Sequence, residues 1–189
     1  MGQLSLNHTT NRLFEEISSV AQLRQAFKLV KANRGKAGID GINIETYEAH
    51  LNEETLNLSK ELRDWEYRPK PVKRVEIPKP GNRTEKRKLG IPCVRDRVLQ
   101  TSIKISIEAL FEEEFSDNSY GFRPGRNQKQ AIARARQYVQ EGKEWIVDID
   151  LEKFFDRINQ DKLMHLLAKK IEDKKVLRLI GMTVRSGVL

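Results

Sequence analysis

The sequence predicts an α+β fold on three observations. Most of the chain repeats its apolar residues with the period of a helix, and the strand-like segments are few and separated by these helices. Apolar residues make up 38% and charged residues 33% of the 189 positions. This composition, without any low-complexity tract, is typical of a packed and unusually charged globular protein.

The first two helices are expected over residues 20–32 and about 45–66. In the first, apolar residues recur at helical spacing until the glycine-rich NRGKAGIDG at 33–41 ends the helix. The second ends before the prolines of YRPKP at 67–71, because the residue before a proline disfavours the helical conformation. Its predicted apolar face comprises Tyr47, Leu51, Leu58, Leu62 and Trp65.

A β-hairpin is predicted next, over residues 72–92. Apolar and basic side chains alternate on both sides of Pro-Gly-Asn, and we expect the basic side chains to share one face. Between Arg68 and Lys88 there are nine Lys and Arg residues against two Glu, in a chain of net charge +8. Such a patch suits a polyphosphate partner, although a solvated protein face can have the same composition.

The second half of the chain is predicted to contain one strand among helices. A long helix covers about 94–115 and ends in the acidic EEEF, and SDNSYGFRPGRNQ at 116–128 has the composition of a turn. Asn127 can cap a helix that runs to about 141. EWIVDID at 144–150 then predicts a short strand, followed by helices near 160–170 and 173–186.

Two carboxylates occupy the end of this predicted strand. Residues two apart in a strand point to the same face, so Asp148 and Asp150 are expected to project together. Paired carboxylates can hold Mg²⁺, as phosphoryl transfer requires, but aspartates at strand ends also cap loops and form salt bridges. The following Phe154 and Phe155 could form the wall of a pocket beside such a metal, or could pack in the core.

The remaining composition excludes several classes of protein. Cys93 is the only cysteine, which rules out an internal disulfide framework and a cysteine metal cage, and favours a reducing, cytoplasmic location. The polar first residues lack the apolar region of a signal peptide. No apolar run approaches the roughly 20 residues that a membrane span needs, so no membrane partner is expected.

Six ordered motif blocks give a more specific indication. In order and spacing, the chain resembles the early part of group II intron-encoded reverse transcriptases, from about Phe14 to Leu189. The blocks are GIDGI, YRPKPVKRVEIPKPG, KLGIPCVRDRVLQ, NSYGFRPGRNQKQAI, VDIDLEKFFDRINQDKLM and DKKVLRLIGMTVRSGVL. The resemblance implies a right-hand polymerase, with an N-terminal extension and fingers in residues 1–125 and the N-terminal part of an incomplete palm in residues 126–189.

The resemblance also implies roles for residues around the predicted strand. Asp150 matches the first catalytic, metal-binding aspartate, and the backbone carbonyl of Leu151 would complete that part of the ligand set. Phe155 matches the aromatic residue that screens the sugar 2′ position and so favours deoxynucleotides. Asp148 falls where the family has no catalytic ligand, so it is expected to be structural or supporting.

Basic residues are expected to contact nucleotide and nucleic acid. Lys79 and Arg87 match the positions in the fingers that meet the incoming dNTP. The nucleic-acid contacts expected from the hairpin and the GFRPGR turn are Lys73, Arg74, Arg123 and Arg126. The last two could equally brace their own loop.

The implied function is RNA-directed DNA synthesis by a fragment of a polymerase. Such an enzyme binds an RNA template, a primer that can be DNA, dNTP and, when complete, Mg²⁺. The family continues to a PQG block and a YADD strand that supplies further metal ligands, and neither string occurs here. We therefore expect a fragment that is inactive alone. Its exposed palm edge favours self-association or a second polypeptide that completes the palm.

Two other functions remain open from the sequence. One is a non-catalytic RNA-binding module that assists intron splicing, as maturases do, which requires the basic patches but not Asp150. The other is a Mg²⁺-dependent nuclease using Asp148 and Asp150, for which the sequence shows no further recognisable site residues.

Overall fold

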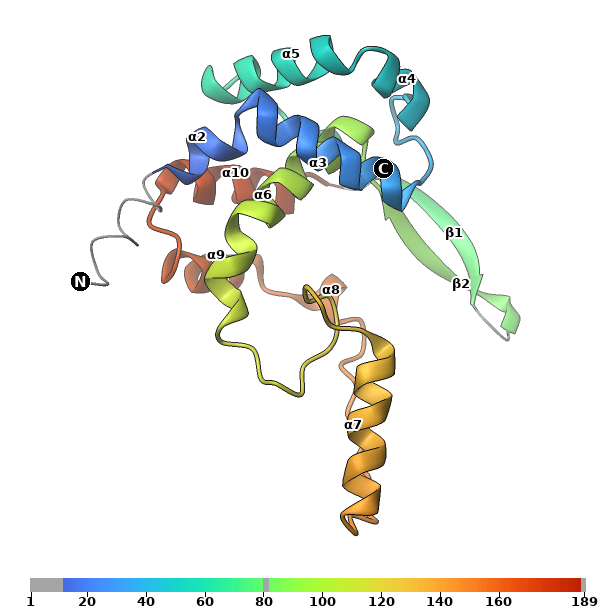
Figure 1. Ribbon diagram of the computed structural model, residues 1–189. Helices are drawn as coiled ribbons and strands as arrows, with labels where there is room; N and C mark the ends of the chain where they lie inside the picture. Colours follow the sequence, from blue (N-terminus) through green and yellow to red (C-terminus); the bar gives the residue numbers. More distant parts are fainter. Residues whose placement is uncertain (1–11, 80–81, 188–189) are drawn as a thin grey trace, which may run out of the picture. The chain divides into compact units, whose positions relative to one another are not determined.

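A computed structural model describes residues 12–79 and 82–187, and in these ranges the chain is a set of helices with one two-stranded sheet. This confirms the predicted α+β class (Figure 1). The elements are α2 (Leu13–Ile17), α3 (Val20–Asn33), α4 (Ile44–Ala49), α5 (Leu51–Arg63), β1 (Lys73–Lys79), β2 (Asn82–Ile91), α6 (Val94–Glu112), α7 (Gln128–Gln140), α8 (Phe154–Arg157), α9 (Gln160–Ala168) and α10 (Lys174–Val184).

Contacts divide the chain into two compact units. Unit 1 combines residues up to 107 with those from 160 onward, and unit 2 comprises residues 108–159. The predicted boundary at residue 125 separates the fingers from the palm as the family defines these domains, and it stays a prediction.

None of the described helices is long and apolar enough to cross a membrane.

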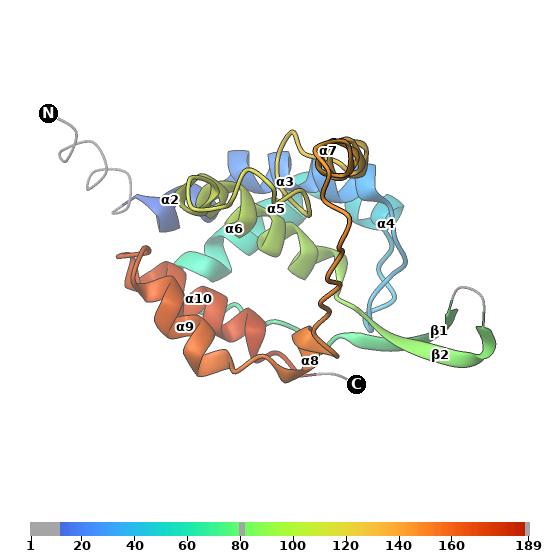
Figure 2. The ribbon, with the colours of Figure 1, turned by 90° about the horizontal axis from the view of Figure 1, so that it is seen from below.

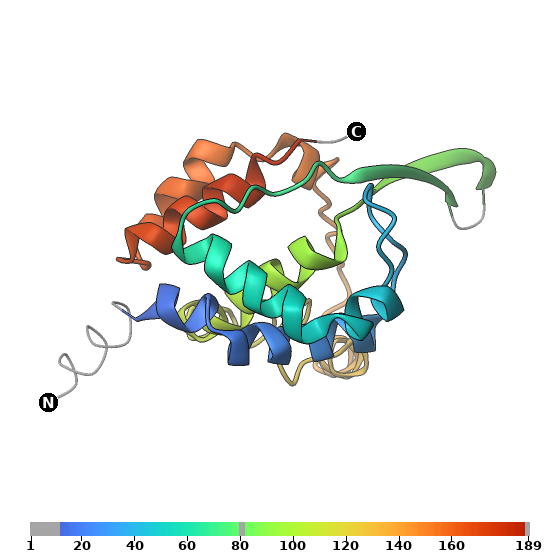
Figure 3. The same ribbon diagram turned by 90° about the horizontal axis from the view of Figure 1, so that it is seen from above.

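The core of unit 1 lies among its helices. α3 and α5 lie side by side (Figure 3), and α9 and α10 form a second adjacent pair (Figure 2). α10 is fixed to α2 through Asp173, whose side chain caps the helix at Lys175 N and Val176 N and also accepts a hydrogen bond from Phe14 N at 3.1 Å. The fully buried side chains include Leu23, Phe27, Tyr47, Leu58, Val94, Leu99, Val176 and Leu179.

The single helix predicted over 45–66 is wrong, because the chain breaks it at His50. Asn43 caps the start of α4, where its side chain accepts a hydrogen bond from Thr46 N. α5 begins as a separate helix, whose first turn includes the bond from Glu54 N to His50 O. At the break, His50 leaves helical geometry with φ −114° and ψ 20°. Tyr47 before it is buried, and its ring stacks on Phe27 with centroids 5.4 Å apart. Burial of one large aromatic ring stabilises the fold by about 1.5–3 kcal/mol, less the cost of the buried Tyr47 hydroxyl, which has no hydrogen-bond partner among the described residues.

The strand predicted over 144–150 is also wrong: these residues form no strand in the described structure. Strands are stabilised by hydrogen bonds to a neighbouring strand, and the only sheet among the described residues is the hairpin. The segment is therefore left exposed, with Trp145 94% and Ile146 84% accessible. In the same unit, the predicted cap of α7 is confirmed as a capping box between Asn127 and Gln130.

The chain between α5 and β1 is anchored by a buried carboxylate. The Tyr67 hydroxyl donates to Asp96 Oδ1 at 2.7 Å, and Lys70 N donates to Asp96 Oδ2 at 3.2 Å. Burial raises the pKa of Asp96, and burial together with the Asp96 charge raises the pKa of Tyr67. These bonds attach the start of the hairpin to the first turn of α6.

Replacing Tyr67 with Phe should destabilise the chain by about 1–3 kcal/mol, because Asp96 Oδ1 would lose a buried donor while the ring volume stays nearly constant. Urea unfolding measures the change. Tyr138→Phe is the matched control, since Arg134 and Lys143 contact the ring of Tyr138 rather than its hydroxyl. We expect the control to stay within about 0.5 kcal/mol of the unmodified chain. Equal stability of both variants would show that the Asp96 bond contributes nothing.

Candidate functional site

The predicted hairpin is confirmed as β1 and β2, but its basic residues occupy both faces. The strands pair antiparallel, with Val75 opposite Leu89 and Ile77 opposite Arg87. Opposed residues share a face and consecutive residues alternate between faces. Arg74, Lys86 and Lys88 therefore lie on one face, and Lys73 and Arg87 lie on the other with Val75, Ile77 and Leu89. The prediction of one basic face is wrong because KR at 73–74 and KRK at 86–88 are consecutive runs.

Most of the hairpin charge is available to a partner. Lys73, Arg74, Arg87 and Lys88 are exposed. Glu76 partly neutralises the first face through a contact of 3.2 Å with Lys86, but both groups are exposed and such pairs are weak. The backbone of Lys79 pairs with Asn82 at an irregularity in the ladder, and its side chain lies outside what the structure describes.

Arg123 has a bracing role in the loop after α6. Its side chain is only 6% exposed and contacts Glu112 Oε1 through Nε at 2.9 Å and Nη2 at 2.7 Å. Its Nη1 donates to the carbonyls of Ser116 and Ser119, and its guanidinium lies 5.2 Å from the Phe115 ring centroid. Of the two roles that the sequence left open, the structure shows bracing, and contact with nucleic acid stays a prediction.

Arg126 makes looser contacts in the same loop. It donates to Asp117 O at 3.1 Å, lies 3.4 Å from Asp117 Oδ1, and is 5.6 Å from the Tyr120 ring centroid. Its side chain is more accessible than that of Arg123. An external anion could therefore reach Arg126 without breaking a buried network. Its contact with nucleic acid nevertheless stays a prediction.

The carboxylates and phenylalanines of VDIDLEKFF lie at the surface of unit 2. Asp148 and Asp150 are both exposed, as is Leu151. Phe155 is 82% exposed and meets Phe154 edge to face, with ring centroids 5.5 Å apart. Neither ring is buried in a core, so the core-packing alternative for this pair is not observed. The accessible Phe155 ring is free to line a binding pocket.

The described residues do not by themselves form a magnesium site. No group of three or more His, Cys, Asp or Glu side chains among them is placed to hold a metal ion. Asp150 offers carboxylate oxygens, which Mg²⁺ prefers, but one carboxylate and one carbonyl leave most of an octahedral shell unfilled. Asp150 and the Leu151 carbonyl would therefore supply only part of a Mg²⁺ ligand set.

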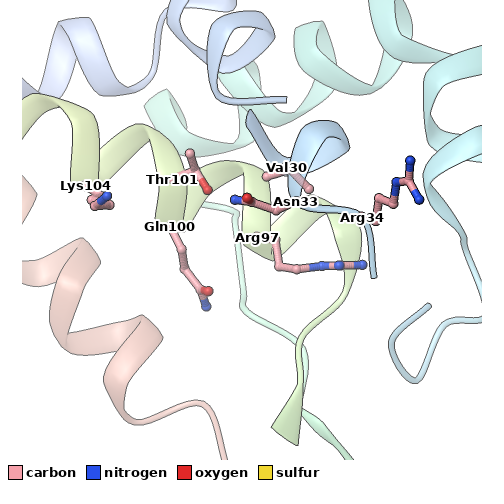
Figure 4. Close-up of a pocket in the computed structure, with 7 residues that line it drawn as sticks. All are labelled: Val30, Asn33, Arg34, Arg97, Gln100, Thr101 and Lys104. Carbon is pink, nitrogen blue, oxygen red and sulfur yellow. The ribbon is translucent and has the colours of Figure 1, made fainter. Parts of the chain in front are cut away.

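A pocket of about 260 Å³ lies between the end of α3 and α6 in unit 1 (Figure 4). Arg97 crosses it and donates through Nη2 to Lys36 O at 2.8 Å, and burial lowers the pKa of Arg97. Arg34 points away from the pocket (Figure 4), so the two arginines do not converge on one ligand. Arg97 instead holds the 34–41 loop in place through its bond to Lys36 O. In the same loop, Gly38 approaches Cys93 so closely that a Cβ on Gly38 would lie 2.7 Å from the Cys93 backbone.

Three cations that the sequence did not single out lie on another surface of unit 1. Arg178 and Arg185 line two hollows on α10, and Arg68 lines one of them. The sequence feature that could have indicated this surface is the spacing of Arg178 and Arg185, since residues seven apart lie on the same face of a helix. The Asp96–Tyr67 bond was equally unpredicted, because no sequence pattern links residues so far apart.

Comparison with known proteins identifies the family. The family model described as reverse transcriptase (RNA-dependent DNA polymerase) matches residues 77–185, more than half of the chain. The chain belongs to the reverse transcriptase family. Relatives include protein YkfC of Escherichia coli, 32% identical over 182 residues, and the group II intron-encoded protein LtrA of Lactococcus lactis, 30% identical over 187 residues. A putative COX1/OXI3 intron 2 protein of Saccharomyces cerevisiae is 31% identical over 183 residues.

These relatives confirm the resemblance to group II intron-encoded reverse transcriptases and show how much of them the chain represents. The matches cover 93%, 99% and 93% of this chain, but only 47% of YkfC, 31% of LtrA and 20% of the yeast protein. The chain thus spans about half the length of YkfC and about a third of LtrA. The reverse transcriptase match includes Arg87, Asp150 and Phe155, whereas Lys73 and Arg74 precede it.

The predicted site residues of this reverse transcriptase chain belong to two units. Lys73, Arg74 and Arg87 lie in unit 1, and Asp150 and Phe155 lie in unit 2 with Arg123 and Arg126. The structure brings the hairpin cations together on one sheet. It also brings Asp150 and Phe155 together on one segment.

Arg123→Lys should loosen the loop after α6, because a lysine cannot bond at once to the Glu112 carboxylate and two carbonyls. Losing bonds worth about 1–3 kcal/mol should speed amide hydrogen exchange in residues 113–122 by roughly tenfold or more. Arg126→Lys, with longer and more exposed contacts, is the control and should change exchange by less. Equal protection in both variants would contradict the bracing role.

Proposed function

We propose that the chain forms the fingers and the beginning of the palm of an RNA-directed DNA polymerase of the group II intron type. The observation that carries this proposal is the reverse transcriptase match over residues 77–185, which contains β2 of the basic hairpin, with the exposed Arg87, together with Asp150. Residues 1–125 would supply the N-terminal extension and fingers, and residues 126–189 the N-terminal part of the palm.

In this proposal the hairpin holds the anionic reactants. Lys73 and Arg74 contact the RNA backbone, while Lys79 and Arg87 contact the triphosphate of the incoming dNTP. Exposed Lys and Arg side chains attract phosphates at long range, and the guanidinium of Arg87 can bond to two phosphate oxygens at once. Arg126, and Arg123 where its bracing bonds allow, contact the template or a DNA primer.

The second unit supplies the groups for chemistry. The Asp150 carboxylate and the Leu151 carbonyl would hold Mg²⁺, and the exposed Phe155 ring would select deoxynucleotides by contact with the sugar. Bound Mg²⁺ neutralises charge on the triphosphate and favours ionisation of the attacking hydroxyl. Because the described residues gather no three-residue metal cluster, the chain is proposed to be inactive alone.

A second polypeptide, or self-association, would complete the palm. The segment around Trp145 and Ile149 is apolar and more than four-fifths exposed. Exposed apolar segments with unpaired backbone groups favour pairing with another strand. A strand that also carries acidic residues would cover this segment and add metal ligands.

The alternative proposal is a non-catalytic, maturase-like RNA-binding module that assists intron splicing. It is supported by the exposed cations of the hairpin, and no group of three or more potential metal ligands is found among the described residues. This function requires the cations alone.

RNA binding is the first test of both proposals. A labelled single-stranded RNA should bind the chain with an affinity that falls steeply with salt, by a log–log slope of roughly 0.7 per phosphate neutralised. The double variant Arg74→Gln/Lys88→Gln should reduce that slope by about 1.4 if each cation meets one phosphate. Fluorescence anisotropy from low to high salt measures it.

The matched control is Lys60→Gln/Arg63→Gln, which removes two exposed cations from α5 and should leave the slope unchanged. A slope that is independent of salt, or equal in both double variants, would contradict binding through the hairpin.

Mg²⁺-dependent primer extension on an RNA template separates the two functions. We expect no extension by the chain alone, and extension when a polypeptide carrying the remaining palm and thumb of a group II intron reverse transcriptase is added. Asp150→Asn should abolish extension in the mixture, because it removes a metal-binding charge. RNA affinity should stay within about twofold, since loss of one exposed carboxylate changes the attraction for phosphates only slightly in salt.

Two outcomes would overturn parts of this assignment. Extension by the unassisted chain would show that its own residues complete the site. Full activity of Asp150→Asn in the mixture would remove Asp150 from the chemistry and favour the RNA-binding alternative.

A further inference from the structure

A groove on the surface of unit 1 gathers three arginines over an apolar floor. Two hollows of about 420 and 500 Å³ share the lining residues Arg178, Met182 and Arg185, and we treat them together as one depression. Arg68 and Ser186 line one end, and Met164 lines the other. We call this depression the α9–α10 groove, after the two adjacent helices that carry most of it (Figure 2).

Two of the arginines are held in position by aromatic and backbone contacts. The guanidinium carbon of Arg178 lies 4.4 Å from the Trp65 ring centroid, and Trp65 itself stacks on Phe14 at 5.3 Å. Arg68 Nη1 donates to the carbonyls of Trp65 and Tyr67 at 2.8 Å each. Among the side chains that the structure describes, no carboxylate forms a salt bridge with either arginine.

The third arginine has a partner that an external anion can replace. Arg185 lies 2.8 Å from Asp161, but the side chain of Asp161 is 88% exposed and that of Arg185 is 59% exposed. Exposed ion pairs contribute little to stability, so exchange of Asp161 for a phosphate costs little. No acidic residue of the described chain lines either hollow.

Guanidinium groups held in this way suit phosphates. Each can present two parallel N–H donors to two oxygens, and a side chain that is already ordered loses less conformational entropy on binding. The half-buried methionines of the floor can adapt to the irregular outline of a sugar or a base. The groove thus combines fixed positive charge with an adaptable apolar surface.

The groove is also joined to the hairpin. Val72 N, next to the first residue of β1, donates to Gly187 O at 3.2 Å, directly after the groove residues Arg185 and Ser186. The groove therefore ends close to the start of β1, where Lys73 and Arg74 follow on the two faces of the hairpin. A polyanion long enough to cover both would gain from both sets.

We propose that the α9–α10 groove binds the phosphate backbone of single-stranded RNA, as a contact additional to the hairpin. The inference rests on the RNA binding proposed above, and it adds a surface outside the residues assigned to nucleotide and template. An acidic peptide could also meet three arginines. RNA is favoured because its repeating phosphates can continue from the groove to the hairpin.

The first test compares two double variants in the anisotropy titration with a single-stranded RNA of about 20 nucleotides. Arg178→Gln/Arg185→Gln should weaken binding about tenfold or more and lower the salt slope by about 1.4. Lys60→Gln/Arg63→Gln, the same charge change on α5, should do neither. Arg178→Lys/Arg185→Lys should recover much of the salt slope but not the full affinity, because lysine lacks the planar, paired donors.

A second readout does not remove Arg178 from its contact with Trp65. Cys93 is fully buried and is the only cysteine, so Ser186→Cys introduces the single accessible thiol, at one end of the groove. RNA should slow its alkylation by a maleimide severalfold. Asn57→Cys, on the exposed face of α5, is the control and should react at the same rate with and without RNA.

The outcomes distinguish the two proposals. A chain that binds no RNA overturns both the proposed function and the groove. The groove alone is overturned by a different set of results. In that case the hairpin variant weakens RNA binding, the groove variants bind normally, and RNA leaves the alkylation rate of Ser186→Cys unchanged. Protection of the introduced thiol by poly-glutamate but not by RNA of equal charge would show that the groove takes an acidic peptide instead.

Discussion

The buried carboxylate of Asp96 is the constraint on which the arrangement of unit 1 depends. It accepts one bond from the Tyr67 hydroxyl and one from Lys70 N, and so ties the chain entering the hairpin to the first turn of α6. Burial alone would make this charge costly, and the two donors offset that cost. The hairpin extends from the core with few other contacts, so the direction of its cations depends on where this anchor places Val72 and Lys73.

The same anchor orders the neighbouring surface. Tyr67 is preceded by Trp65, whose φ of 59° is unusual for a bulky residue and is stabilised by the stack of Phe14, Trp65 and Arg178. Lys175 Nζ lies 5.1 Å from the centroid of the Phe14 ring. Two cations one turn apart on α10 thus each contact one ring of the stacked pair, which helps to hold α10 in place and to order the Arg178 guanidinium.

The sequence predicts those features whose stabilising interactions join residues close in the chain. Apart from the helix over 45–66, the helices with regular apolar spacing, the Asn127 cap and the hairpin depend on residues close in the chain, and they were predicted correctly. The break at His50, the Asp96–Tyr67 bond and the inward turn of Arg123 depend on partners that no spacing rule identifies. The strand at 144–150 failed for a related reason: its composition favours a strand, but a strand also needs a neighbour. The motif blocks supplied the family, because six ordered blocks carry more information than any single pattern.

Binding and chemistry place different physical demands on this chain, and its two units differ accordingly. Phosphate binding needs positive charge at the surface, and it tolerates some freedom because the attraction acts over a distance near the Debye length. Metal-assisted transfer needs several carboxylates held within a few ångströms, which a single exposed aspartate cannot provide. Unit 1 has a buried core and anchored cations, so it can bind an anion as it stands. Unit 2 presents Asp150 beside an exposed apolar segment. Under the proposed function, an association that covers Trp145 and Ile149 would also bring further metal ligands to Asp150, so that burial of this segment and assembly of the proposed metal site would be one event.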